Sequence, residues 1–287
     1  MKSGDNLSIN GLIREVCMLT RMKRIMWNER YLAVVLGIFA YTLFPLLSRM
    51  WRARGDGILY AYTAFEEAFV FSFLSSDYYL PFAYVAPLVG SVVCGNLYLD
   101  DLRNGCVALM RIRESKVRYH IRNLVAVAIS CFLLFLIPLG LNLIVSMIGF
   151  PLSNSMMASS ALATTAYHNP YRDFGEANVF NLLQEHHPYI HISMRLLANS
   201  LLYASFAILN YGLSVFARFK KYINNLIIEL VFAGLVLYFN YCGGNFSFVT
   251  YLLASESMMT FLCLCAVVVC TNVFAFILLI CGMRRRS

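Results

Sequence analysis

The sequence predicts an all-α, polytopic membrane protein with about six transmembrane helices. Composition is the first reason: of the 287 residues, 60% are apolar and only 13% are charged, and the mean hydropathy is +0.67. Soluble domains are about 25% charged, and a soluble fold of this length could not bury so much apolar surface. Composition therefore excludes a soluble enzyme, and residues 1–287 are expected to form a single membrane domain.

A series of long apolar stretches is the second reason, because a helix needs about 20 such residues to cross the hydrocarbon core. In chain order the predicted spans are residues 31–48, 79–99, 123–149, 196–217, 222–239 and 258–283. As a helix, the apolar run at 124–149 would be about 39 Å long. We therefore expect it to tilt or protrude, with Pro138 as the place for a kink. The predicted external loops are residues 49–78, 150–195 and 240–257.

Two shorter segments are predicted to lie in the membrane interface. In residues 9–28 an apolar stripe recurs at near-helical spacing, the arginines lie elsewhere on the wheel, and Trp27 stands at the boundary. This pattern is typical of a helix in the headgroup layer, although a simple basic leader is the alternative. The stripe is Leu12, Val16, Leu19 and Met26, and the arginines are Arg14, Arg21 and Arg24. Residues 246–254 are apolar but too short to span, which favours a re-entrant or interfacial helix before the last span.

The placement of basic residues predicts the orientation. Most of the 23 lysines and arginines fall before the first span, at 100–122, at 218–221 and after the last span, whereas the predicted external side keeps Arg49, Arg52, Arg54, Arg172 and Arg195. By the positive-inside rule both termini are cytoplasmic. The net charge of +8 is then a topology signal whose partners are anionic lipid headgroups, and nucleic acid is not an expected partner.

The predicted cytoplasmic loop at 100–122 is the most informative segment. Asp100 and Asp101 open it, where a helix N-terminus favours negative charge, and Gly105 permits a turn or close packing. A basic cluster follows, made of Arg111, Arg113, Lys116 and Arg118, and Ser115 is placed to cap a helix that runs through Tyr119 into the third span. The plain alternative is an ordinary basic loop that obeys the positive-inside rule.

This pattern resembles the permease subunits of bacterial ATP-binding-cassette (ABC) transporters of the ABC-2 type, including those of Gram-positive antimicrobial-peptide export and immunity systems. Such permeases have six spans, an N-terminal interfacial helix and, after the second span, an acidic residue, a glycine and a basic segment ending in tyrosine. Here Asp100 or Asp101, Gly105, residues 111–116 and Tyr119 match that order. The residue-level match covers about residues 73–123, including Leu80-Pro81, Pro87-Leu88 and Gly95.

The resemblance implies a function that this chain performs with partners. Residues Asp100, Asp101, Gly105, Arg111, Arg113, Lys116 and Tyr119 would couple to a cytoplasmic ATPase subunit, present in two copies beside a second or homologous permease in the bacterial cytoplasmic membrane. The chain has no Gly-x-x-x-x-Gly-Lys-Ser/Thr loop, so ATP and magnesium are expected in the partner and the chain is not expected to be an enzyme by itself. An amphipathic peptide or a lipid-like molecule is the expected cargo.

Glu229 is the only acid in the core of a predicted span. A buried carboxylate in lipid is costly, so it should face protein or water, and Asn224 and Asn225 lie one turn away where they could satisfy it. Glu229 and Asn225 are therefore candidates either for a translocation path or partner contact, or for a polar contact between helices.

The histidines suggest the rival class of function. His187 and His191 are four residues apart and lie beside Glu185 and His186, but Pro188 argues against an uninterrupted helix, so we expect a polar external loop without metal. An intramembrane enzyme would use these histidines with Glu66 or Glu67, and a non-transporting structural or sensory protein is the third class. The nine cysteines are expected to pack as small apolar residues, and no catalytic or cofactor-binding set is assigned.

Overall fold

The computed structural model describes residues 20–53, 64, 68–69, 76–107, 115–150, 152, 187–217, 219–242 and 258–285. Throughout these residues the regular secondary structure is helical, and six helices are long and apolar enough to cross a membrane. The predicted all-α, multi-pass membrane fold is therefore confirmed. The predicted short helix at 246–254 and most of the one at 9–28 lie outside the described residues, as do Arg111 and Arg113.

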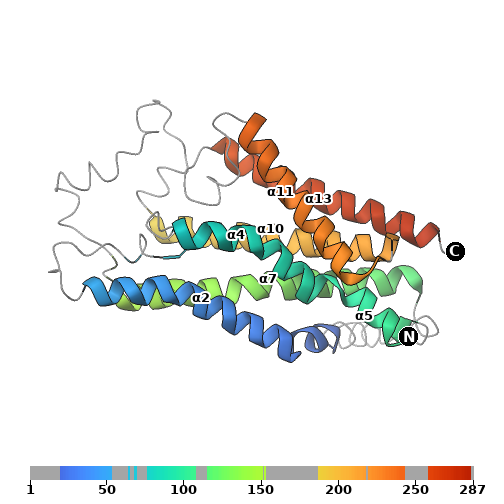
Figure 1. Cartoon of the computed structure of the whole chain (residues 1–287), viewed down its shortest axis with the longest axis horizontal. Helices are drawn as coiled ribbons and strands as arrows, with labels where there is room; N and C mark the ends of the chain where they lie inside the picture. The colour runs from blue at the N-terminus through green and yellow to red at the C-terminus, as the bar shows by residue number, and fades with distance from the viewer. Residues whose placement is uncertain are drawn as a thin grey trace, which may run out of the picture.

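The spans form an elongated bundle of roughly parallel and antiparallel helices (Figure 1). They are α2 (Glu29–Ala53), the continuous run α4 (Ser76–Gly90), π-helix η3 (Ser91–Gly95) and α5 (Leu97–Arg103), then α7 (Lys116–Gly149), α10 (Pro188–Ala217), α11 (Lys221–Cys242) and α13 (Met258–Arg284). At one end of the bundle α5, α10 and α13 end and α2, α7 and α11 begin. We call it the basic end after the lysines and arginines that flank these helix ends.

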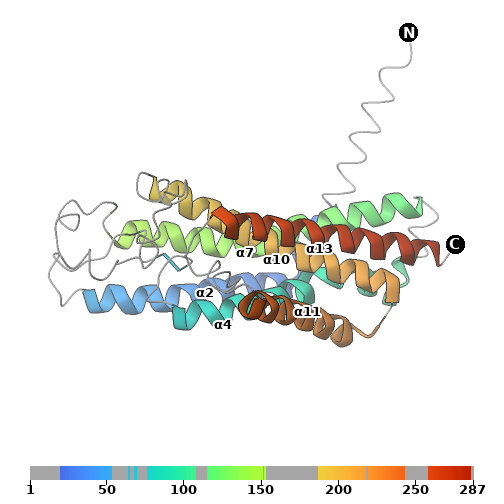
Figure 2. The ribbon, with the colours of Figure 1, turned by 90° about the horizontal axis from the view of Figure 1, so that it is seen from above.

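Helix α10 is the centre of the bundle, and α11 lies at its periphery (Figure 2). Helix α10 packs against α13, α7, α4 and α11, and 72% of its most apolar stretch is buried, against 22% for α11. Helix α2 packs mainly on α7. The outer helices therefore present large apolar side chains outward, as lipid-facing surfaces do.

Helices α10 and α13 approach each other closely at two glycines. A Cβ added to Gly212 would lie 2.7 Å from the backbone oxygen of Ala275, and one added to Gly282 would lie 2.9 Å from Cα of Phe216. Small residues permit this approach of two backbones, which increases van der Waals contact where no hydrophobic effect drives helices together. Asn272 adds a hydrogen bond, donating from Nδ2 to Oγ of Ser205 over 3.0 Å.

Several helices extend further than the apolar runs predict. The second span continues as helix to Arg103, α7 begins at Lys116 rather than at 123, and α10 begins at Pro188 rather than at 196. The predicted loop at 100–122 is thus helical at 100–103 and at 116–122. The added turns carry polar side chains that are buried against other parts of the protein, and hydropathy alone does not detect such partners.

Part of the predicted external loop at 49–78 folds back into the bundle. Ala64, Ala68 and Phe69 are buried, and the Phe69 N–H donates to Oδ1 of Asn142 on α7 over 3.0 Å. The Phe69 ring packs edge-to-face on Phe82 of α4, with 5.6 Å between the ring centroids. These residues therefore belong to the core at the end opposite the basic end.

Candidate functional site: a polar junction at the basic end

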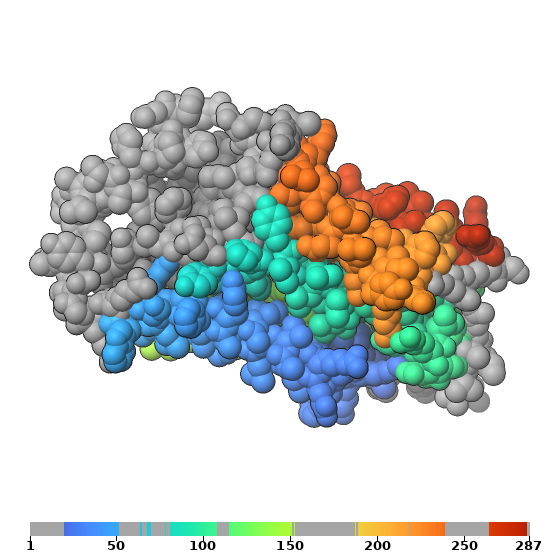
Figure 3. Space-filling model, in the orientation of Figure 1, coloured from blue at the N-terminus to red at the C-terminus, as the bar shows by residue number. Residues whose placement is uncertain are grey.

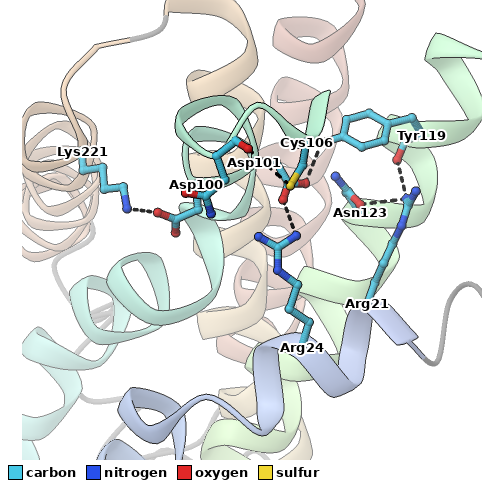
Figure 4. A network of polar contacts seen from close by, with 9 residues as sticks. Arg21, Arg24, Asp100, Asp101, Cys106, Tyr119, Asn123 and Lys221 are labelled. Atoms are coloured by element: carbon cyan, nitrogen blue, oxygen red, sulfur yellow. Dashed lines mark hydrogen bonds and ion pairs between the residues drawn. The ribbon is translucent and has the colours of Figure 1, made fainter. Parts of the chain in front are cut away.

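Charged and polar side chains from four segments meet at the basic end (Figure 4). We call this set the junction; its members are Arg21, Arg24, Asp100, Asp101, Tyr119, Asn123 and Lys221. They come from the short helical stretch at residues 20–26, from α5, from the start of α7 and from the start of α11. The chain leaves α5 at residue 104 and enters α7 from residue 115 beside them.

Asp101 is the centre of the junction. Its side chain is 4% exposed, and both of its carboxylate oxygens accept hydrogen bonds: Oδ1 from Nη1 of Arg24 over 2.5 Å, and Oδ2 from the hydroxyl of Tyr119 over 2.7 Å. Burial would lower the pKa of Arg24, but the attraction of the Asp101 carboxylate outweighs it and holds that pKa above its usual value. This buried carboxylate is therefore matched by a cation and a hydroxyl.

Arg21 joins the stretch at 20–26 to α7 by hydrogen bonds. Its guanidinium is buried, and Nη1 donates to the backbone oxygen of Tyr119 over 3.1 Å and to Oδ1 of Asn123 over 2.8 Å. Its Cζ also lies 5.1 Å from the centroid of the Tyr119 ring, a cation–π contact. Arg21 and Arg24 were predicted only to lie off the apolar stripe of an interfacial helix; their guanidinium groups find acceptors on α7 and α5.

Two contacts hold the flanks of this connection to α11 and α13, one from the junction and one from Lys116. Lys221, the first residue of α11, forms an ion pair with Asp100. Lys116, the first residue of α7, donates from Nζ to the backbone oxygen of Met283 over 2.5 Å. It thus supplies a hydrogen bond to a carbonyl in the last turn of α13, where the helix itself has no donor for it. Both flanks of the connection at 104–115 are thus held to other helices.

The start of this connection is an exposed turn. Gly105 has φ of +69°, its N–H donates to the backbone oxygen of Leu102 over 3.3 Å, and a Cβ there would meet no atom within 4 Å. The left-handed conformation, rather than space, is therefore the reason for a glycine at this position. Ser115 is the N-cap residue of α7 as predicted, but its side chain makes no capping hydrogen bond.

A second polar group lies deeper in the bundle, where the second span changes from π-helix to α-helix. We call Asn96, Asn210 and Asn225 the asparagine cluster. Oδ1 of Asn225 accepts from Nδ2 of Asn96 over 3.2 Å and from Nδ2 of Asn210 over 3.0 Å, and the same two amides donate to the backbone oxygen of Ser91 over 3.3 and 3.0 Å. The three side chains therefore join η3, α10 and α11 and supply donors to a carbonyl of the π-helix.

This arrangement corrects the predicted surroundings of Glu229. Asn225 bonds within the asparagine cluster, and Nδ2 of Asn224 donates to Oγ of Ser214 over 3.0 Å. Oε2 of Glu229 is buried and has no hydrogen-bond partner among the described residues. Sequence reasoning identified Asn225 but missed Asn96 and Asn210, whose only signal is an amide inside an apolar run.

Of the two described histidines of this group, His191 lies in a helix and not in the polar loop that the sequence predicts. His191 and Arg195 are buried within α10, whereas His187 is exposed just ahead of it. Pro188 begins the helix instead of interrupting it, which suits a residue without an N–H. The described part of the chain contains no group of three or more histidine, cysteine or acidic side chains placed to hold a metal. Glu66, Glu67, Glu185 and His186 lie outside the described residues.

The comparisons with known proteins identify no relative. No protein-family model, curated protein or solved structure matches this chain. Its function is therefore inferred from the residues and their arrangement alone.

Proposed function

We propose that this chain is the transmembrane permease subunit of an ABC transporter of the ABC-2 type, with residues 104–115 as the segment that docks on a separate ATPase subunit. The junction is the observation that carries the proposal. Together with the contact of Lys116 on α13, it connects the two flanks of this segment to residues 20–26, α7, α11 and α13. A displacement applied to the segment would therefore reach four parts of the bundle through direct hydrogen bonds and ion pairs.

The seven residues assigned to coupling have different roles in this proposal. Asp100, Asp101, Lys116 and Tyr119 bond other helices, so we assign them to transmission of the displacement. Gly105 lies in the exposed turn, and we assign it, with Arg111 and Arg113, to the contact with the ATPase. ATP and magnesium would be bound by that partner.

Charge supports a cytoplasmic position for the basic end. Among the described residues, the cations at this end are Arg21, Lys23, Arg24, Arg30, Arg103, Lys116, Arg118, Arg122, Lys220, Lys221, Arg284 and Arg285. Following the positive-inside rule, we propose that both chain ends lie in the cytoplasm of a bacterial cell. We propose a pair of permeases, identical or homologous, with two ATPases, moving an amphipathic peptide or lipid-like cargo.

Copurification tests the proposal. The tagged full-length chain is solubilised from its native membrane and isolated, and its partners are identified by mass spectrometry. We expect an ATPase with a Gly-x-x-x-x-Gly-Lys-Ser/Thr loop to accompany the wild-type chain and to be lost from the double variant Arg111→Glu, Arg113→Glu, because the acidic residues would repel the docking surface.

The matched control is Arg49→Glu, which reverses a charge near the opposite end of α2 and should keep the ATPase. Membrane insertion of all variants is checked by fractionation. A chain that inserts and purifies with no ATPase would contradict the transporter proposal and leave the intramembrane enzyme and the structural or sensory protein as the remaining classes. An ATPase that stays bound to the double variant would remove the assignment of residues 104–115.

A further inference from the structure

The contacts of two neighbouring residues on α11 show which way Glu229 faces. Asn225, four residues earlier, bonds Asn96 just after η3, and Phe232, three residues later, packs edge-to-face on Tyr84 of α4 with 6.4 Å between ring centroids. Residues at these spacings share one side of a helix. Glu229 therefore lies on the side of α11 that faces the second span, between these two contacts.

The facing part of the second span is largely apolar. Since α4 and α11 run in opposite directions, the level of Glu229 falls between Tyr84 and Asn96, where residues 85–90 are Val, Ala, Pro, Leu, Val and Gly and residues 91–95 are Ser, Val, Val, Cys and Gly. The nearest asparagines are already bonded elsewhere, and Oε2 of Glu229 is buried without a partner among the described residues. The acid thus lies in a largely apolar contact that gives this oxygen no hydrogen bond.

The surroundings of Glu229 are open on one side. Figure 3 shows α11 and α4 next to each other on one face of the molecule. Large apolar side chains of α11 and of the second span are exposed near this level: Leu226 and Leu230 on α11, Val85 on α4 and Val92 on η3. A ligand that reached the carboxyl group would lie against apolar side chains and meet one negative group.

We propose that Glu229 is the recognition point for a cationic amphipath, a ligand with one positive group on an apolar body, bound between α11 and α4. This inference rests on the proposed function and names the class of its cargo. Charge complementarity selects the occupant, because an acid without a cation or donor in an apolar span is costly and a bound cation supplies both the counter-charge and the apolar cover. The asparagine cluster lies one turn away from the acid, so the bound positive group would sit directly beside the contact that joins α11 to the second span.

Binding of two ions of the same shape and opposite charge tests this inference. The purified chain is placed in phosphatidylcholine nanodiscs, and calorimetry measures the binding of tetraphenylphosphonium and of tetraphenylborate, with empty nanodiscs subtracted. We expect saturable binding of the cation alone. Glu229→Gln, which keeps the shape and removes the charge, should weaken it by about tenfold or more.

Two control variants make the result specific. Glu229→Asp should retain part of the affinity, and Glu29→Gln, which removes an exposed acid from the first turn of α2, should leave it unchanged. Equal binding of both ions, absence of saturable cation binding, or full affinity in Glu229→Gln would overturn the inference. A change from dimer to monomer in Glu229→Gln with unaltered cation binding would also overturn it, since Glu229 would then belong to a contact with a second copy. None of these outcomes depends on the ATPase, so the proposed function would stand or fall separately.

Discussion

The junction and the asparagine cluster both hold the second span to α11, but they do so by different chemistry. The junction, at the end of the bundle, uses carboxylates, guanidinium groups and a lysine, and one of its acids is partly exposed. The asparagine cluster, about one turn deeper along the second span, uses neutral amides that are buried. The charges of the junction are thus balanced by partners, whether buried as Asp101 is or partly exposed as Asp100 is, and the deeper contacts use amides that carry no charge.

The difference has an energetic consequence. Loss of one partner at the surface exposes the other to water, which replaces most of the bond, whereas loss of one partner in the interior leaves a donor or acceptor unsatisfied. We therefore expect the cost of a substitution to fall from the asparagine cluster to the buried acid of the junction and then to its exposed ion pair.

The largest effect is expected for Asn210→Leu. The amide of Asn210 serves both Asn225 and the Ser91 carbonyl, and the side chain is fully buried, so its removal should cost about 3 kcal/mol of stability. Thermal unfolding of the detergent-solubilised protein measures this. Asn104→Leu, the same change at an exposed position, is the control. Equal losses in the two variants would show that the cluster contributes nothing specific.

An intermediate effect is expected for Asp101→Asn. The substitution removes the charge that pairs with Arg24 and weakens the bond from Tyr119, which should cost about 2 kcal/mol. Asp100→Asn changes the neighbouring acid, which is 45% exposed, and should cost less than about 1 kcal/mol. Chemical denaturation of both variants provides the comparison, and a larger loss for Asp100→Asn would reverse the proposed order.

The smallest effect is expected for Lys221→Gln, which breaks the exposed ion pair with Asp100. Water screens this pair, so the loss should be about 0.5 kcal/mol at low salt and should vanish near 1 M salt, where the Debye length is about 3 Å. The same unfolding measurement at two salt concentrations is sufficient. A loss that persists at high salt would indicate that the pair behaves as a buried one.

The sequence predicts the number and type of helices because long apolar runs are local features. It does not predict where α7 and α10 begin, because the added turns carry polar side chains: Lys116 bonds Met283 on α13, and Arg195 is buried. The inward position of Arg21 was missed for the same reason, since a helical wheel assigns a basic residue to the headgroups. Glu229 was found because a charge stands out in an apolar run, whereas Asn96 and Asn210 do not.

The close contact between α10 and α13 also bears on how the protein is assembled during synthesis. Helix α10 enters the membrane before α11 and α13, yet Gly212 and Ser205 on it receive their partners, Ala275 and Asn272, only from α13. The newly inserted central helix therefore presents an unmatched surface of small and polar residues to lipid until α13 arrives. Helix α11 is made in the interval and must pack against α4 and α10 without covering that surface. It can do so because α11 and α13 lie on different sides of α10.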